Sequence, residues 1–311
     1  MHLTIDRRRH LASAVAVMAL AAIVALPVEA AADVLTIGSV EEDVQAEKAI
    51  FVPLCDYLSE HLKEHGVDEV RLVVHTSING IAGAFDRGEL DLYLDSPVLT
   101  AVIARDANAA PFLRSWKEGV SAYSTIIYVR SDSDAATLDD LAGQRIAFKK
   151  RESTPGYFMP RAHFAAQSVP MVELRATDEP VPEDHVGYVF SHGDKTTLGW
   201  VMTGRVAAGV MKDADLEAPE LRGIGDRIRV IAETPPMPRQ VLTRRRDLDP
   251  ALVTALRVVL TSMHETPEGR AVLQALDETR KFDEFPGGGR AVFERIWSML
   301  EMVDAARDAG S

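Results

Sequence analysis

A strand, a polar turn and the start of a helix carry the clearest chemistry in this sequence. Residues 146–157 read Ile-Ala-Phe-Lys-Lys-Arg-Glu-Ser-Thr-Pro-Gly-Tyr. A helix N-terminus presents backbone N–H groups that have no partner in the helix, together with a partial positive charge. The hydroxyls of Ser153 and Thr154 would add two donors, so the segment predicts a binding site for a small anion. Such residues most often only cap the helix, and that structural alternative stays open.

Basic residues precede this helix start. Lys149, Lys150 and Arg151 are consecutive. They could steer anions towards the site, or they could form an ordinary solvated turn.

The elements that would position these residues alternate between strand and helix. We expect strands at 34–38, 70–75, 90–94, 123–130, 145–148, 187–190, 207–211 and 227–232. A first helix, with apolar residues at 50, 54, 58 and 62, is expected after a loop at 39–44, and further helices at 78–87, 97 onwards, 138–143, 154–167 and 196–203. This alternation indicates a parallel α/β sheet. In the first helix Pro53 falls early enough to be tolerated. Asp249 can cap a later helix that has Pro250 at its first position.

The chain is expected to cross twice between two such units, near 121–130 and 233–243, so the sequence predicts an α/β fold of two lobes with a ligand cleft between them. We assign residues 33–124 plus 239–311 to lobe 1 and residues 125–238 to lobe 2. In the final helix Val292, Ile296, Met299, Leu300 and Val303 lie on one apolar stripe.

The composition excludes several classes of function. The chain has 311 residues, 47% of them hydrophobic, and 47 Asp+Glu against 34 Lys+Arg give a net charge of -13. This acidic balance argues against a nucleic-acid partner. A single cysteine excludes a disulfide framework, and Cys55 is expected to be a small buried hydrophobe. His61 and His65 have the spacing of two metal ligands, but no third ligand accompanies them, so we expect no metal and no cofactor.

The first residues have the layout of a bacterial export signal. Arg7, Arg8 and Arg9 precede an apolar run over residues 11–27, and small residues follow at 30–32. We expect residues 1–32 to be an export signal peptide, resembling the twin-arginine type, that is cleaved near Ala30 to Ala32. An uncleaved anchor is the alternative. The mature protein would then reside in the periplasm and meet the membrane only through a partner.

Several segments resemble one known family in matching order. Residues 153–161 read Ser-Thr-Pro-Gly-Tyr-Phe-Met-Pro-Arg and resemble the Ser-Thr-Ser-Gly-Tyr-x-x-Pro segment of phosphonate-binding (PhnD-like) periplasmic proteins. Residues 53–59 are similar to the family's Pro-Leu-x-x-Tyr-Leu-Ser helix. Residues 190–194, Phe-Ser-His-Gly-Asp, fall where the family has a Gly-Ser-His-Asp type of turn. Residues 90–97 and 206–210 resemble two of its strands.

The resemblance implies a type II periplasmic binding protein of an ABC transporter. Carried onto matching positions, it implies that Ser153, Thr154, Gly156 and His192 hold ligand oxygens. A protonated His192 would supply a cation, although the residue would also suit a surface turn. Placement at cleft-facing turns or at a crossover adds Asp95, Ser96, Tyr123 and Asp194. Tyr157 could line the cleft or belong to the core.

Two departures from the family pattern bear on the ligand. Pro155 replaces the second serine of the family's segment, which removes one hydroxyl and one backbone donor. Asp95 would repel a dianion unless it accepts a proton from the ligand or the ligand carries an amine.

The sequence therefore predicts a protein that captures a small oxyanion, either phosphonate, phosphite or phosphate, and delivers it to an ABC transporter permease. A periplasmic oxyanion sensor that signals to a histidine kinase, with arsenite as one example of a ligand, is the alternative. An enzyme is not expected, because the sequence has no Gly-x-Ser-x-Gly motif and no paired catalytic carboxylates.

Overall fold

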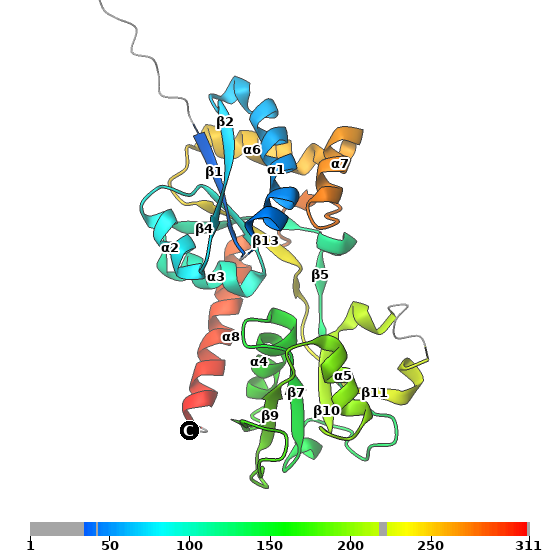
Figure 1. The fold of residues 1–311 in the computed structure, drawn as a ribbon. Helices are drawn as coiled ribbons and strands as arrows, with labels where there is room; N and C mark the ends of the chain where they lie inside the picture. The colour runs from blue at the N-terminus through cyan, green and yellow to red at the C-terminus, as the bar shows by residue number, and fades with distance from the viewer. Residues whose placement is uncertain (1–33, 42, 218–222, 310–311) are drawn as a thin grey trace, which may run out of the picture. The chain divides into compact units, whose positions relative to one another are not determined.

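Two six-stranded sheets and a short two-stranded sheet organise the chain (Figure 1). The computed structural model describes residues 34–41, 43–217 and 223–309. The expected export signal, residues 1–32, lies outside the described residues. Within the described part, no helix combines the length and the apolar character that crossing a membrane would require.

The first sheet has the strand order β14-β4-β13-β3-β1-β2. Its strands are β1 (Val34–Val40), β2 (Glu69–His75), β3 (Leu92–Asp95), β4 (Ala109–Ser115), β13 (Gln240–Arg245) and β14 (Phe282–Asp283). Alternate side chains point to opposite faces, so Leu92 and Leu94 enter one core while Tyr93 enters the other. Helices α1 (Val44–His61), α6 (Pro250–Ser262) and α7 (Pro267–Ala275) cover the first face; α2 (Ile78–Asp86), α3 (Pro97–Asp106) and α8 (Gly289–Ala309) cover the second.

The second sheet has the order β11-β6-β10-β7-β9-β8. It consists of β6 (Thr125–Arg130), β7 (Arg145–Phe148), β8 (Met171–Glu173), β9 (Val186–Phe190), β10 (Ala208–Lys212) and β11 (Ile228–Glu233). Helix α4 (Met159–Ala166) packs on one face and α5 (Asp194–Met202) on the other. Short helical turns complete the fold: η1 (Lys63–His65), η2 (Lys117–Gly119), η3 (Asp139–Leu141), η4 (Thr154–Phe158), η5 (Asp213–Glu217), η7 (Gly225–Arg227) and η8 (Met263–Glu265).

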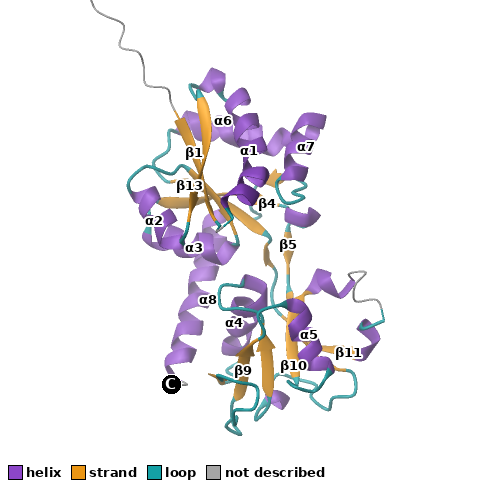
Figure 2. Cartoon of the chain, in the orientation of Figure 1, coloured by secondary structure: helices purple, strands orange, loops and turns teal. Residues whose placement is uncertain are grey.

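Two connections join the sheets. Strands β5 (Ala122–Tyr123) and β12 (Met237–Pro238) form an antiparallel pair in which Met237 lies opposite Tyr123; β5 is visible between the two sheets in Figure 2. The expected two-lobed α/β fold is therefore confirmed. The lobe boundaries proposed at 124/125 and 238/239 stay a prediction.

The start of α4 is packed against elements of the first lobe. Phe158, Met159 and Ala162 belong to the same hydrophobic cluster as residues of α2, α3 and α8. Helix α8 contacts α3 and β4 in the first lobe as well as α4 and β8 in the second. Its expected apolar stripe is confirmed, because Ile296 and Val303 are buried in this cluster. Burial at this interface therefore fixes the position of the predicted anion-binding segment.

Several details differ from expectation. The sheets are mixed rather than purely parallel: β1, β2 and β3 are parallel, but β13 runs antiparallel to β3 because the chain enters it from the other lobe. The single strand expected at 123–130 is two strands, since β5 pairs with β12 while β6 pairs with β10 and β11. Strands β4 and β8 and helix α7 were not foreseen.

The first helix begins where the expected loop at 39–44 ends, but Pro53 does not lie near its start. Asp43 caps it by accepting N–H bonds from Gln45 and Ala46, so α1 starts at Val44 and Pro53 lies in its interior. The expectation that Pro53 falls early in the helix is therefore wrong. A proline there removes one backbone hydrogen bond, and the apolar face that α1 buries must compensate for it. By contrast, the Asp249 cap is confirmed: its carboxylate accepts from Ala251 and Leu252.

Candidate functional site

The predicted anion-binding helix starts with a single π-helical turn, η4, that leads into α4. Ser153 Oγ accepts the Gly156 N–H at 3.0 Å, which is the capping role considered for it. Thr154 is only 2% exposed, and its Oγ1 makes no well-formed hydrogen bond to any described residue. An unpaired buried hydroxyl typically costs about 1–3 kcal/mol, so Thr154 is available to bind a ligand oxygen.

Gly156 is needed for packing. A Cβ at this position would lie 2.5 Å from Lys149 Cβ, and the Gly156 carbonyl accepts the Lys149 N–H at 2.9 Å. The Gly156 N–H donates a hydrogen bond to Ser153 Oγ. The turn thus lies directly on the end of β7. A ligand contact from Gly156 stays a prediction.

Tyr157 belongs to the aromatic core of the second lobe. Its ring lies 5.5 Å from the Phe148 ring in an edge-on arrangement and 5.3 Å from the Phe190 ring. The core interpretation of this residue is confirmed, while its contact with ligand remains a prediction.

The turn that carries His192 lies against Lys149. His192 is exposed, has a left-handed φ of 62°, and donates its N–H to the Lys149 carbonyl at 2.8 Å. Asp194 opens α5 and pairs with Lys149 Nζ at 2.6 Å. A left-handed conformation is uncommon for a residue with a Cβ and is often retained at functional turns.

Asp95 and Ser96 lie where β3 ends and α3 begins. The Asp95 carboxylate accepts the Tyr93 hydroxyl and the Ser96 N–H. Burial raises the pKa of Asp95 above its ordinary value, even though these hydrogen bonds oppose the shift. Ser96 Oγ is buried beside the Asp95 carboxylate, and it makes no well-formed hydrogen bond to any described residue. Helix α3, which Ser96 precedes, contacts η4, which begins at Thr154.

Tyr123 joins these parts to a residue that the sequence did not reveal, Arg239. The Arg239 guanidinium lies over the Tyr123 ring, 5.4 Å from its centre. Burial is the main influence on Tyr123 and raises the pKa of its phenol. The Arg239 charge and a contact with the Thr154 hydroxyl lower this pKa, while the Asp95 charge raises it, so Arg239 and Thr154 lie beside the ring and Asp95 acts on it through its charge. Arg239 Nε is buried and has no acceptor within the described chain. Only the pairing of β5 with β12 brings Arg239 here, and no local motif signals it.

These residues form one candidate site, which we call the crossover site: Asp95, Ser96, Tyr123, Thr154 and Arg239. Asp95 also lines a cavity of 200 Å³ in the first lobe, together with Ser39, Glu47, Lys117 and Asp277. The cavity lies at the carboxyl ends of β1 and β3, the edge at which open α/β sheets bind ligands. The crossover site therefore offers hydroxyl and guanidinium donors next to a protonatable carboxyl group.

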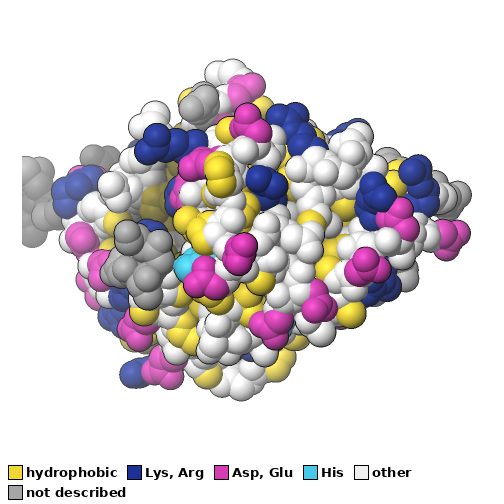
Figure 3. All heavy atoms as spheres, turned by 90° about the horizontal axis from the view of Figure 1, so that it is seen from below, with side chains coloured by type: hydrophobic (Ala, Val, Ile, Leu, Met, Phe, Trp, Pro, Cys, Tyr) yellow, Lys and Arg dark blue, Asp and Glu magenta, His cyan; other side chains and the backbone are white. Residues whose placement is uncertain are grey.

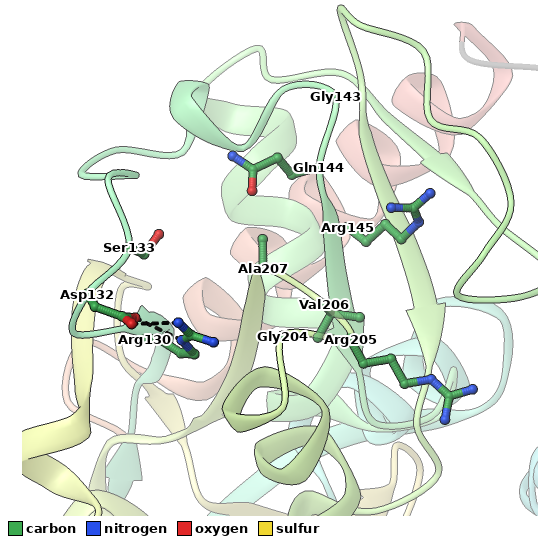
Figure 4. Close-up of a pocket in the computed structure, with 10 residues that line it drawn as sticks. All are labelled: Arg130, Asp132, Ser133, Gly143, Gln144, Arg145, Gly204, Arg205, Val206 and Ala207. Carbon is green, nitrogen blue, oxygen red and sulfur yellow. Dashed lines mark hydrogen bonds and ion pairs between the residues drawn. The ribbon is translucent and has the colours of Figure 1, made fainter.

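A second, larger pocket of 330 Å³ in the second lobe does not have this character (Figure 4). Arg130 there is paired with Asp132, whereas Arg145 and Arg205 extend away from that pair. Arg145 donates to the Glu179 carbonyl and Arg205 to Thr177 Oγ1. The three guanidinium groups do not converge on one point. On the face shown in Figure 3, basic and acidic side chains are interspersed rather than gathered by sign.

Cys55 is 4% exposed, and burial raises the pKa of its thiol to about 12. The expectation of a buried hydrophobe is confirmed. A thiol held in its protonated form is a poor ligand for arsenite.

Two mixed α/β lobes joined by paired crossover strands define the two-lobed fold of type II periplasmic binding proteins. Residues 39–285 match the family described as "ABC transporter, phosphonate, periplasmic substrate-binding protein". The chain belongs to this family, as its sequence motifs indicate. The family consists of transport proteins that bind solutes and not of enzymes.

Several solved structures share this fold. The chain is similar to XAC2383 from Xanthomonas citri, solved with ATP bound, at 21% identity and a TM-score of 0.77, covering 88% of this chain and 98% of that one. It is also similar to PhnD1 from Prochlorococcus marinus in complex with methylphosphonate, at 15% identity and a TM-score of 0.59, covering 87% and 98%. A binding component of an ABC phosphonate transporter from Pseudomonas aeruginosa matches at 17% identity and a TM-score of 0.51, covering 88% and 97%.

Proposed function

We propose that this protein captures a small phosphorus oxyanion (phosphonate, phosphite or phosphate) at the crossover site and delivers it to the permease of an ABC importer. One observation carries the proposal: among the described residues, the buried polar atoms Ser96 Oγ, Thr154 Oγ1 and Arg239 Nε have no well-formed hydrogen bond. The nearest groups to the two hydroxyls are Asp95 and Tyr123, which belong to the same proposed site. All three atoms can donate a hydrogen bond. A tetrahedral oxyanion has several oxygens that could accept from them at once, and a charge-assisted bond from Arg239 would add to its affinity.

Asp95 gives the site a preference among oxyanions. Its raised pKa favours a carboxyl group that shares a proton with the ligand. Phosphorus oxyanions keep an ionisable O–H near neutral pH, whereas sulfate and sulfonates do not. We therefore expect the site to prefer the phosphorus compounds over sulfate.

Capture and delivery follow from the two-lobed fold. The ligand would contact α3 in the first lobe, η4 in the second and both crossovers, so it would bind the closed arrangement more tightly than the open one and shift the population towards it. A permease that recognises the closed arrangement would then receive loaded protein. The predicted export signal and the family both support a periplasmic location.

Isothermal titration calorimetry on protein purified from the periplasm tests this function. The panel contains methylphosphonate, phosphite, phosphate, sulfate, ATP and arsenite. We expect saturable binding of at least one phosphorus oxyanion, with loss of affinity in Thr154→Val and Arg239→Gln. Binding of ATP alone would instead indicate a nucleotide ligand, and binding of arsenite alone would favour the sensor alternative. The absence of measurable binding for all three phosphorus oxyanions would reject the proposal.

A further inference from the structure

Glu118 occupies an unusual backbone position next to the crossover site. It lies in η2 with φ 56° and ψ 29°, in the left-handed region, and Gly119 follows with φ 77°. A residue with a Cβ is disfavoured there. Such a conformation persists only where the surroundings hold it in place, and the contacts of the Glu118 side chain show what does so here.

The Glu118 carboxylate joins three parts of the fold. Its Oε2 accepts from Arg239 Nη2 at 2.9 Å and from Lys212 Nζ at 3.4 Å. Glu118 follows β4 of the first sheet, Lys212 ends β10 of the second, and Arg239 follows the second crossover. Lys212 also pairs with Asp215 at 3.2 Å. Burial opposes the charge on Glu118, but Arg239 and Lys212 outweigh it and keep the pKa of this carboxyl below its ordinary value.

This contact helps to determine the orientation of the Arg239 guanidinium. The guanidinium is 14% exposed, its Nη2 is bound to Glu118 and its face lies on Tyr123. Its Nε is left buried with no acceptor among the residues that the structure describes. A guanidinium is planar, so fixing one N–H and one face fixes the direction of the others. Without Glu118 the long side chain would regain its rotamer freedom.

We propose that Glu118 is a positioning residue for ligand binding: it holds Arg239 with Nε directed to the ligand oxygen, and by sharing its carboxylate with Lys212 it links that orientation to the approach of the second lobe. The inference rests on the proposed function and goes beyond it, because Glu118 itself contacts no ligand.

A double-mutant cycle with methylphosphonate as the probe tests this role. Glu118→Gln should weaken binding about fivefold, equivalent to about 1 kcal/mol, since the carboxylate is 47% exposed and water screens the pair. In an Arg239→Gln background the same substitution should change affinity less than twofold. Equal losses in both backgrounds would show that Glu118 does not act through Arg239. Glu118→Asp should restore part of the affinity, because it keeps the charge.

Two further variants complete the design. Glu60→Gln removes an exposed carboxylate near the end of α1 that pairs with Lys63 of η1, and it should leave affinity unchanged. Lys212→Gln should weaken binding about twofold to threefold, less than Glu118→Gln, because its contact is longer. Unaltered affinity in Lys212→Gln would overturn the link to the second lobe while leaving the positioning of Arg239 intact.

A measurement without ligand separates this inference from the proposed function. The Arg239 Nε–H resonance, assigned through Arg239→Lys, should be sharp and slowly exchanging in the wild-type protein. It should broaden or exchange faster in Glu118→Gln but not in Glu60→Gln. An unchanged resonance would reject the positioning role, whichever ligand the wild-type protein binds. Failure of every phosphorus oxyanion in the titrations would reject the proposed function alone.

Discussion

The guanidinium of Arg239 lies on the ring of Tyr123, 5.4 Å from its centre, although the two residues belong to different crossovers. The pairing of β5 with β12 brings them together. A cation over an aromatic face contributes about 0.5–2 kcal/mol, more where water is excluded. Because both strands pass between the lobes, this contact joins the two connections about which the lobes would move.

The first prediction concerns the ring of Tyr123. Tyr123→Phe keeps the aromatic face beneath Arg239 and should retain affinity for methylphosphonate within about threefold. Tyr123→Leu removes that face and should lower affinity about tenfold, or about 1.4 kcal/mol. Calorimetric titration of both variants distinguishes the ring from the hydroxyl. Equal losses in the two variants would assign the effect to the phenol oxygen instead.

Thr154 should matter for binding and not for folding. Thr154→Val has nearly the same shape but lacks the hydroxyl, which makes no well-formed hydrogen bond to any described residue, so the melting temperature should stay the same or rise. Affinity should fall about tenfold, because one ligand bond is lost. The matched variant is Ser153→Ala, which removes the cap on Gly156 and should cost about 0.5–2 kcal/mol of stability. Thermal melts and titrations on the same samples check both. Full affinity in Thr154→Val would remove this residue from the site.

Asp95 should make stability depend on pH in a defined direction. Burial raises its folded pKa above the unfolded value of about 3.9. The folded state then binds the proton more tightly than the unfolded state. The resulting stability is fully present below the unfolded pKa and is lost as pH rises through the folded pKa. Asp95→Asn mimics the protonated form, so it should raise the melting temperature more at pH 8 than at pH 4.

The same substitution tests proton sharing with the ligand. If Asp95 and the oxyanion share a proton, the wild-type protein takes up part of a proton on binding, and the apparent enthalpy varies with the ionisation enthalpy of the buffer. Asp95→Asn should lose that dependence. Replacing the exposed Asp68 by asparagine is the control and should alter neither measurement. A melting temperature that falls in Asp95→Asn at pH 8 would contradict the assigned direction.

Local signals predicted much of this molecule. The alternation of apolar strands and helices gave the two α/β lobes, and Asp249 with Pro250 marked the start of α6 correctly. The prediction that Pro53 falls early in its helix was wrong, because a proline in a helix interior is disfavoured locally. The tertiary burial of Phe51 and Leu54 stabilises the helix around it. The strands β4 and β8 have weak patterns and are stabilised by their neighbours in the sheet.

The candidate site, like the fold, was predictable only where local sequence signals mark its residues. Ser96, Tyr123 and Thr154 stand at turns and helix starts that the sequence marks, and the structure brings Thr154 into contact with Tyr123. Arg239 and Glu118 carry no local signal, since their roles arise from contacts between segments far apart in the chain. Gly156 was marked by a motif, but its packing against Lys149 became visible only in three dimensions.

Arg161 offers a test of stability separate from binding. It is 1% exposed, its Nε and Nη1 have no acceptor among the described residues, and its guanidinium lies 5.8 Å from the centre of the Tyr188 ring. A buried charge without a counter-ion is costly, and an apolar side chain of similar size is often better tolerated. Arg161→Met should therefore keep or raise the midpoint of urea unfolding and leave ligand affinity unchanged. A large loss of stability would indicate an acceptor that forms in solution.

The packing of α4 on the first lobe should couple stability to binding. Met159 is fully buried in the cluster that α2, α3 and α8 share with the second lobe, and it follows η4 directly. Met159→Ala should cost about 2–5 kcal/mol of unfolding free energy. It should also lower affinity, because the cavity it leaves releases the helix that carries Thr154.

Leu273→Ala is the matched control, since Leu273 is equally buried but lies in the cluster on the opposite face of the first sheet. Leu273→Ala should lose similar stability in urea unfolding while keeping its affinity for methylphosphonate. Equal losses of affinity in both variants would mean that general destabilisation, and not the contact between the lobes, controls ligand binding.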